Sequence, residues 1–363
     1  MFPTRRIITS GGDVFRDEYS LAFDGSDDNI RIPTIAYSVH DANFSFVFWC
    51  KRAVTNSAHV ILGNTGVSGA KHIRFTDSGV IEFESDTAAD AADITLAVDD
   101  TNWHHYVVIA SSGTVTAYQD GVSLSVSGDV GSNDVTFDTI AGQSTSGTTR
   151  TFNGNISEIA VYNIALSSSQ AKQIYNGREP FDHKNWSKTG NLTQWWRMGD
   201  GRFDEYFTSN GLISDEVTPT IGTNLHSAFT NQDFDSHTVN GTGFTAANTA
   251  SSSSENNYSA ISCTSAKIYK VFYDATINSG ATPTVEVSTN AALSGTDVYN
   301  PSLTTGGTEF VFKASASTMY FGFRVNSTTS NFTVADSVTV QEVGGNASEM
   351  VNMDAVDFQG DTP

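Results

Sequence analysis

The chain has 363 residues, of which 38% are hydrophobic, enough for two or three domains with separate cores. It carries 40 acidic and 19 basic residues and a formal net charge of −21 at pH 7. Such a surface repels phosphate backbones, so no nucleic-acid partner is expected, and it offers carboxylates to divalent cations. Short runs rich in Val, Ile, Thr and Phe, separated by Gly and Asn, predict an all-β protein.

The N-terminal stretch, residues 1–14, forms a predicted polar arm with an isolated basic pair, Arg5 and Arg6. We expect this arm either to be disordered or to dock onto a larger acidic assembly. No apolar run follows the first residue, so the sequence predicts neither a signal peptide nor membrane insertion. A protein released by cell lysis, such as a virion component, needs no export signal. Cys50 and Cys263 fall in different predicted domains and are expected to be buried thiols.

Apolar residues recur at every second position between residues 15 and 182. In FSFVFWC, which starts at Phe44, both alternating sets are apolar, and this predicts a central strand that is covered on both faces. Further along, Ser167 and Gln170 form a capping-box pattern that begins a short helix. Asn176, followed by Gly, predicts the left-handed end of that helix.

Three segments of this region carry a family resemblance. They are YSLAFDGSDDNIRIP from Tyr19, TNWHHYVVIASSGTVTAYQDG from Thr101 and RTFNGNISEIAVYNIALSSSQAKQIYN from Arg150. In this order they resemble the laminin-G-like (concanavalin-A-like) jelly roll, a β-sandwich of two sheets. The resemblance covers residues 15–182 and implies a module that binds sugars or builds surfaces, although the same fold also hosts glycosidases.

Residues 183–228 form a predicted connector with NLTQWWRMGDG at its centre. Trp195 and Trp196 are adjacent, so in a strand they face opposite ways and at most one can line a given surface. We therefore expect them to dock two sandwiches together, with a sugar-stacking platform as the alternative.

Residues 229–343 contain five strand-like runs at the spacing of a second sandwich. The last run, NFTVADSVTVQEV from Asn331, resembles the closing strand of galactose-binding-like or carbohydrate-binding-module jelly rolls. The expected architecture is all-β: two tandem jelly-roll β-sandwiches, concanavalin-A-like and then galactose-binding-like, with one short helix and extended termini. The polar tail, residues 344–363, is expected either to wander or to dock on a neighbour.

One strand offers candidate catalytic carboxylates. Glu82, Glu84 and Asp86 lie at positions i, i+2 and i+4, and concanavalin-A-like glucanases carry their acid and nucleophile in a related Glu-x-Asp-x-x-Glu pattern. Two residues along a strand span about 6.6–6.8 Å, between the separations of retaining and inverting glycosidases. The family pattern is not matched, and because Ile81 and Phe83 point inward, we expect the acidic residues to form a solvated outer face. No catalytic residue is predicted.

Histidines give no metal pattern. His104 and His105 follow Trp103 and resemble the family's Trp-His-His-Val strand opener, where a histidine satisfies backbone groups. Consecutive strand residues point to opposite faces, so this pair cannot share one metal ion. His59 and His72 lie isolated, without ligand spacing between them.

An acidic turn is the candidate metal site. Asp24, Asp27 and Asp28 surround Gly25 in FDGSDDN, and carboxylate oxygens suit Ca²⁺. Related jelly rolls often hold one structural Ca²⁺ near this loop, with an Asp from a Gly-x-Ile-Asp-Glu block, where this chain has Ser157. The alternative is a turn that exposes its carboxylates, and no other cofactor is expected.

Two jelly rolls, an acidic surface, an arm and a tail together resemble the virion structural proteins of tailed bacteriophages. We expect a non-enzymatic virion surface protein (a tail fibre, appendage or capsid decoration) that binds host glycans at sites the sequence does not identify. The arm and the tail are expected to contact other virion proteins, and the chain to form a homo-oligomer, with a trimer as one option. The alternatives are a polysaccharide-degrading enzyme or its accessory lectin module, and an architectural spacer without a ligand.

Overall fold

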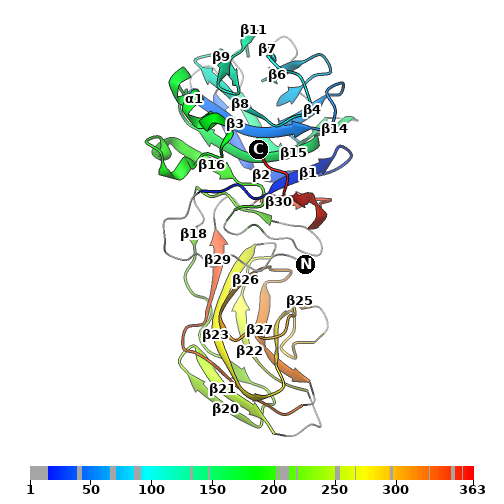
Figure 1. Ribbon diagram of the computed structural model, residues 1–363. Coiled ribbons are helices and arrows are strands. Elements are labelled where there is room, and N and C mark those ends of the chain that lie inside the picture. The colour runs from blue at the N-terminus through cyan, green and yellow to red at the C-terminus, as the bar shows by residue number, and fades with distance from the viewer. Residues whose placement is uncertain are drawn as a thin grey trace. The chain divides into compact units, whose positions relative to one another are not determined.

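The computed structural model divides the chain into two compact units (Figure 1). Unit 1 comprises Met1–Thr218 and Asn346–Pro363, and unit 2 comprises Pro219–Gly345. Unit 2 is therefore inserted into unit 1, and the chain passes between the units twice. The structure describes residues 15–363 except 39–42, 66–70, 86–90, 131–133, 146–147, 202–203, 205–211, 218–219, 250–253, 266, 295–296, 327, 345–347 and 354.

Unit 1 is a sandwich of two antiparallel sheets. The first sheet contains, in spatial order, β10 (Val122–Ser123), β9 (Thr114–Gln119), β8 (His104–Ser111), β3 (Asn43–Arg52), β15 (Asn153–Tyr162), β1 (Ser20–Asp24) and β31 (Phe358–Gln359), and β16 (Leu192–Trp196) also pairs with β15. The second contains β11 (Ser125–Gly128), β7 (Ala91–Thr95), β6 (Val80–Glu84), β5 (His72–Phe75), β4 (His59–Gly63), β12 (Asp134–Ile140), β2 (Asn29–Ser38), β30 (Ser348–Val351) and β17 (Leu212–Ile213). A separate hairpin joins β13 (Gly142–Thr145) to β14 (Thr148–Thr151).

Strand β3 is covered on both faces, as its sequence predicts. Phe44 and Phe46 belong to the main core between the two sheets, together with Phe83 of β6. On the opposite face, Val47 joins a second apolar cluster that includes Ile174 of the helix α1 (Ser168–Tyr175). The first sheet of unit 1 is therefore the middle layer of three.

The helix α1 begins and ends where its capping residues predict. The Ser167 hydroxyl accepts the backbone N–H of Gln170, and the Gln170 side chain accepts the backbone N–H of Ser167 in return. Asn176 ends the helix in the left-handed conformation, at φ 50°. The described chain also has short 3₁₀ turns, η1 (Asn176–Arg178), η2 (His183–Asn185), η3 (Thr189–Asn191) and η4 (Ala355–Asp357). None of its helices is long and apolar enough to cross a membrane.

Much of the predicted connector belongs to unit 1. Its strand β16 pairs with β15, and the two tryptophans lie on opposite faces of that strand. Trp196 is fully buried in the main core, while Trp195 lies in the cluster under α1. Both rings are therefore part of the interior of unit 1, and neither can stack on a sugar at the surface.

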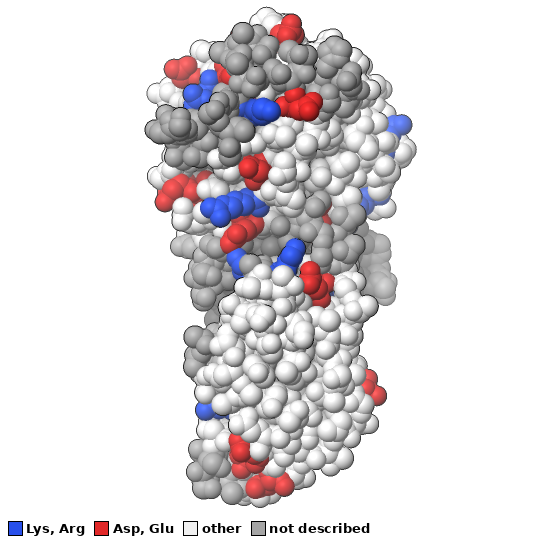
Figure 2. All heavy atoms as spheres, turned by 180° about the vertical axis from the view of Figure 1, so that it is seen from behind, with Lys and Arg blue, Asp and Glu red and all other residues white. Residues whose placement is uncertain are grey.

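Unit 2 is a second antiparallel sandwich, whose core is rich in Phe, Val and Tyr. One sheet contains β18 (Thr220–Ile221), β29 (Thr339–Gly344), β23 (Ile268–Gly280), β28 (Ser330–Val334), β21 (Gly243–Asn248) and β20 (Ser236–Asn240), with β26 (Gly306–Lys313) also on β23. The other contains β19 (Thr230–Asn231), β22 (Ser254–Ser262), β27 (Thr318–Asn326), β24 (Thr284–Ser288) and β25 (Asp297–Tyr299). Few acidic or basic side chains appear on the wide face of unit 2 that Figure 2 shows.

The C-terminal tail completes unit 1. Strand β30 pairs with β2 and β17, and β31 pairs with β1. Met350 is fully buried, and Asp361 lies 2.7 Å from the ammonium nitrogen of Lys51. The expectation of a tail that wanders or docks on a neighbour is therefore wrong, because its apolar residues fill the core of its own unit. The predicted arm, with Arg5 and Arg6, lies outside the described residues.

The all-β class with jelly-roll sandwiches is confirmed by these sheets. Their arrangement along the chain differs from a tandem one, since the second sandwich interrupts the first between Ile213 and Ser348. These two residues are directly paired in β17 and β30. Within unit 2, Thr220 pairs with Gly344 in the same way. Each unit thus holds together the two strands through which the chain leaves and returns.

We predict that Met350→Ala destabilises unit 1 by about 2–5 kcal/mol, because it leaves a cavity in a filled core. Denaturant unfolding measured by tryptophan fluorescence will show the loss, since the five tryptophans all lie in unit 1. The control is Val356→Ala, in the same tail at a side chain that is 72% exposed, which should change stability by less than about 0.5 kcal/mol. Equal effects of the two substitutions would contradict the docked tail.

Candidate functional site

A polar cluster lies on the β5–β6 hairpin, on the side of the second sheet away from the core. The hairpin register pairs His72 with Glu84 and Arg74 with Glu82. The His72 Nε2 atom lies 2.8 Å from Glu82 Oε1 and 3.6 Å from Glu84 Oε2. Arg74 donates to the same Glu82 oxygen through Nε at 2.9 Å and Nη2 at 2.7 Å. One imidazole, one guanidinium and two carboxylates therefore meet at one place.

This face is covered, which corrects the expectation that Glu82 and Glu84 form a solvated surface. Glu84 is 4% exposed and His72 is fully buried, because the β13–β14 hairpin packs against β4. The close approach requires Gly63, where an added Cβ would lie 2.2 Å from a backbone oxygen of the hairpin. Gln143 of the hairpin places its Nε2 atom 3.3 Å from His72 Nδ1. Asp86, the third predicted carboxylate, lies outside the described residues.

The two glutamates differ in their pKa. The hydrogen bond from His72, with the charge of Arg74, lowers the pKa of Glu82 to about 2. Burial, with the adjacent charge of Glu82, raises the pKa of Glu84 to about 7. Burial also lowers the pKa of His72. At neutral pH, Glu82 is therefore ionised, while Glu84 is partly protonated.

Beside this cluster lies an open hollow of about 490 Å³. Its lining includes Arg74 and is otherwise made of small and polar residues, Asn56, Ser57, Ala58, Thr76, Asp77 and Ser78.

The acidic turn brings its three aspartates together. One carboxylate oxygen each from Asp24, Asp27 and Asp28 lies within 4.8 Å of the others. The Asp28 carboxylate already accepts the backbone N–H of Asp24 at 2.8 Å, and Asp24 accepts that of Ser26 at 2.7 Å. Burial, with the charges of Asp24, Asp357 and Asp27, raises the pKa of Asp28 to about 6. These oxygens suit Ca²⁺, and calcium binding at this turn stays a prediction.

Ser157, which stands where the family has an aspartate, serves another contact. Its hydroxyl donates to Asp17 at 3.0 Å. The next residue, Glu158, has a φ of 51° at a bulge of β15, and this turns its side chain into the protein. There it accepts hydrogen bonds from Trp195 Nε1 at 2.6 Å and Arg197 Nε at 3.0 Å. Burial and the charge of Glu158 raise the pKa of Asp17 far above its usual range.

The two adjacent histidines point to opposite faces of β8, as predicted. His104 lies 2.6 Å from Asp120 and 3.0 Å from Asp100, so it contacts carboxylates where backbone groups were expected. His105 packs against Trp49, with ring centroids 4.9 Å apart. Its ring nitrogens have no hydrogen-bond partner in the described part of the chain. Burial lowers the pKa of His105 to about 3, so the ring is neutral.

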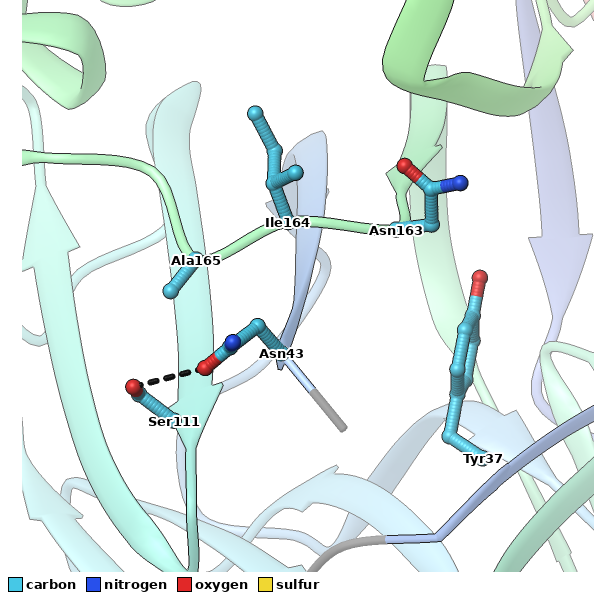
Figure 3. A pocket seen from close by; sticks show the side chains of 6 residues that line it. All are labelled: Tyr37, Asn43, Ser111, Asn163, Ile164 and Ala165. Atoms are coloured by element: carbon cyan, nitrogen blue, oxygen red, sulfur yellow. Dashed lines mark hydrogen bonds between the residues drawn. The ribbon is translucent and has the colours of Figure 1, made fainter. Parts of the chain in front are cut away.

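A hollow of about 530 Å³, whose described lining residues are uncharged, opens where the ends of the two sheets of unit 1 meet (Figure 3). Tyr37 comes from the end of β2, Asn43 from the start of β3 and Ser111 from the end of β8. The segment after β15 adds Asn163, with the apolar side chains of Ile164 and Ala165. The Ser111 hydroxyl donates to the side-chain oxygen Oδ1 of Asn43 at 2.7 Å.

Sequence reasoning did not identify this hollow, because its residues come from four separate segments and form no motif. The ring of Tyr37 stacks on Phe44, with centroids 4.7 Å apart, so its orientation is fixed by the core. The Tyr37 hydroxyl lies 3.2 Å from that of Thr193. Asn43 and Asn163 are exposed, and their amides can contact a ligand.

Residues 24–172 match the family described as the concanavalin A-like lectin/glucanases superfamily. The matched segment is less than half of the chain and lies within unit 1. No sequence among the curated proteins matches the chain.

Several solved structures are similar. A candidate carbohydrate-binding protein from Bacteroides ovatus ATCC 8483 is 17% identical with a TM-score of 0.40, and the match covers 55% of this chain and 56% of that one. The CBM40 domain of the Ruminococcus gnavus IT-sialidase, bound to α2,3-sialyllactose, is 15% identical with a TM-score of 0.33, over 43% and 95% of the two chains. Domain 4 of the extracellular GH43 arabinanase AbnA from Geobacillus stearothermophilus, in complex with arabinotriose, is 19% identical with a TM-score of 0.33, over 43% and 76%. Similarity at this level assigns no residue role.

We predict that Asp17→Asn flattens the pH dependence of stability. The folded-state pKa of Asp17 is raised, so its contribution to stability is lost as the pH rises from its unfolded value of about 3.9 towards the folded value. Between pH 5 and 8 this slope amounts to at most about 1.4 kcal/mol per pH unit. Urea unfolding should therefore show that the variant gains more stability over the wild type at pH 8 than at pH 5.

The control for this prediction is Asp77→Asn, at an exposed turn. It should follow the wild-type curve at both pH values. An Asp17→Asn curve parallel to the wild-type curve would show that Asp17 ionises without cost in the folded protein.

Proposed function

We propose that this protein is a non-enzymatic glycan-binding protein and that the hollow beside Tyr37 is its sugar site. The observation that supports this proposal is the described lining of the hollow, which combines an oriented aromatic ring with amides and a hydroxyl. Sugars offer hydroxyl groups to amides and apolar C–H faces to rings. The described lining residues are uncharged, which favours neutral sugars.

The contacts around the hollow indicate how a sugar would be held. The side-chain oxygen Oδ1 of Asn43 accepts a hydrogen bond from Ser111, and this leaves the NH₂ group of Asn43 to donate to a sugar oxygen. The Asn163 oxygen accepts from Asn191 at 3.0 Å, so its NH₂ group is oriented in the same way. Since the hollow is open to solvent, we expect weak binding that several copies of the protein strengthen by avidity.

The geometry of the glutamate pair supports a role without catalysis. Glu82 Oε1 receives hydrogen bonds from His72 and Arg74, which neutralise it as a nucleophile. His72 is fully buried and Glu84 is 4% exposed under the β13–β14 hairpin, so a polysaccharide chain cannot reach both carboxyl groups. A polysaccharide-degrading enzyme is therefore the less favoured alternative.

The wider role that we propose is a surface protein of a bacteriophage virion, as a tail fibre, appendage or capsid decoration. The supporting observations are the net charge of −21, which keeps a crowded surface soluble, and two β-sandwiches that each have an apolar core of their own. Since residues 348–359 are committed to unit 1, attachment to other virion proteins falls to the arm, residues 1–14. Repetition on a particle, as a trimer or another homo-oligomer, would supply the avidity.

The sugar site is tested by Asn43→Ala. Loss of one hydrogen bond should weaken binding about 2- to 10-fold, measured by titration with a neutral oligosaccharide first selected on a glycan array. The control is Asn326→Ala, an equally exposed amide in unit 2, which should bind as the wild type does. An array without any signal would favour the architectural spacer, and equal affinities for the two variants would show that the sugar binds away from the hollow beside Tyr37.

The virion role predicts that antibodies raised against the protein label purified phage particles in electron micrographs. Mass spectrometry of the same particles should detect peptides from both units. A protein found only in the soluble fraction of the lysate, after complete removal of particles, would contradict this role while leaving the sugar site intact.

A further inference from the structure

We propose that His72, Glu82 and Glu84 form a binding site for a divalent transition-metal ion of the Zn²⁺ class, apart from the sugar hollow. The imidazole nitrogen Nε2 and one carboxylate oxygen from each glutamate lie within 4.8 Å of one another. Two neighbouring strands supply the ligands, and the directly paired positions His72 and Glu84 fix their spacing. A mixed set of one nitrogen and two oxygens suits Zn²⁺ better than Ca²⁺, which takes oxygen ligands.

Glu84 is a carboxyl group buried beside a second one. Its side chain is 6% exposed, and it shares a hydrogen bond with the carboxyl group of Glu82. His72 Nε2 lies 3.6 Å from Glu84 and already donates to Glu82 at 2.8 Å. A carboxylate buried beside a second carboxylate is unfavourable without a counter-charge. A divalent ion bound between them would supply that charge.

Gln143 supplies the second, independent observation. It is 1% exposed, and its Oε1 atom has no partner among the described residues. The amide sits against His72 Nδ1, on the ring edge away from the glutamates. Histidines that bind metal through one nitrogen donate from the other to such a group, which fixes the tautomer. Exchanging the two amide atoms of Gln143 lets its Oε1 accept from the His72 Nδ1–H, and the His72 Nε2 is then free for the metal.

Two arginines limit the affinity of the site. Arg74 donates twice to Glu82 Oε1. Arg150 of the covering hairpin is close enough to interact electrostatically with Arg74 and with both glutamates, and burial together with the charge of Arg74 lowers its pKa. A bound cation must compete with the charge of Arg74 for Glu82. Removing the charge of Arg74 should therefore strengthen metal binding. A cluster that only holds ion pairs would show no such gain.

The test is calorimetric titration of the chelator-stripped, dialysed full chain with ZnCl₂. The wild type should bind one Zn²⁺ at this site. Glu84→Gln, which keeps the shape of the side chain, should weaken binding at least tenfold, and Arg74→Gln should tighten it. Asp28→Asn, in the all-oxygen turn, is the matched control and should leave the Zn²⁺ affinity unchanged. Circular dichroism of each variant establishes that it is folded.

Three results would overturn the proposal. They are no Zn²⁺ bound to the folded wild type, equal affinities for wild type and Glu84→Gln, or an Arg74→Gln variant that binds no tighter. Equal affinities would place the ion at other histidines. Each result leaves the sugar hollow untouched, because none of its lining residues is shared with this cluster.

Discussion

The fold of unit 1 depends on the burial of strand β3 on both of its faces. One face of the strand packs against the opposite sheet, and the other packs under α1 and the tryptophan of β16 that faces the helix. Because the first sheet is enclosed in this way, the polar clusters around His72 and Tyr37 lie away from its two faces. They occupy the outer side of the second sheet, around His72, and the ends of the strands, around Tyr37. Both candidate sites follow from this division.

Local patterns in the sequence predicted the parts of the fold that local forces determine. Period-two alternation identified the strands, and the Ser167–Gln170 box identified the start of the helix, because each depends on residues a few positions apart. The burial of Glu84 could not be predicted in this way, since the hairpin that covers it is some sixty residues away along the chain. The register of β5 and β6, in contrast, could have been predicted from the sequence. A turn centred on Ser78 places Glu84 opposite His72, and the two residues are then neighbours on one face.

The candidate sites differ in the same respect. Asp24, Asp27 and Asp28 are adjacent in the sequence, and the structure brings their carboxylates together, as the composition of the turn suggests. The hollow beside Tyr37 is assembled from four segments whose residues carry no signature. Its combination of an aromatic ring, amides and a hydroxyl can be recognised only once the structure shows that the ends of β2, β3 and β8 converge. Uncharged sites of this kind are the ones that motif reading fails to find.

The insertion of unit 2 has a consequence for biosynthesis. A ribosome releases unit 2 complete, with both of its sheets, while unit 1 still lacks β30 and β31. Until residues 348–359 are synthesised, β1 and β2 each lack a partner strand, and such unpaired edges are prone to join other chains. Folding of unit 2 pairs Thr220 with Gly344, and this brings the following strands back towards unit 1. Because unit 2 is synthesised before β30 and β31, its folding precedes the completion of the two sheets of unit 1.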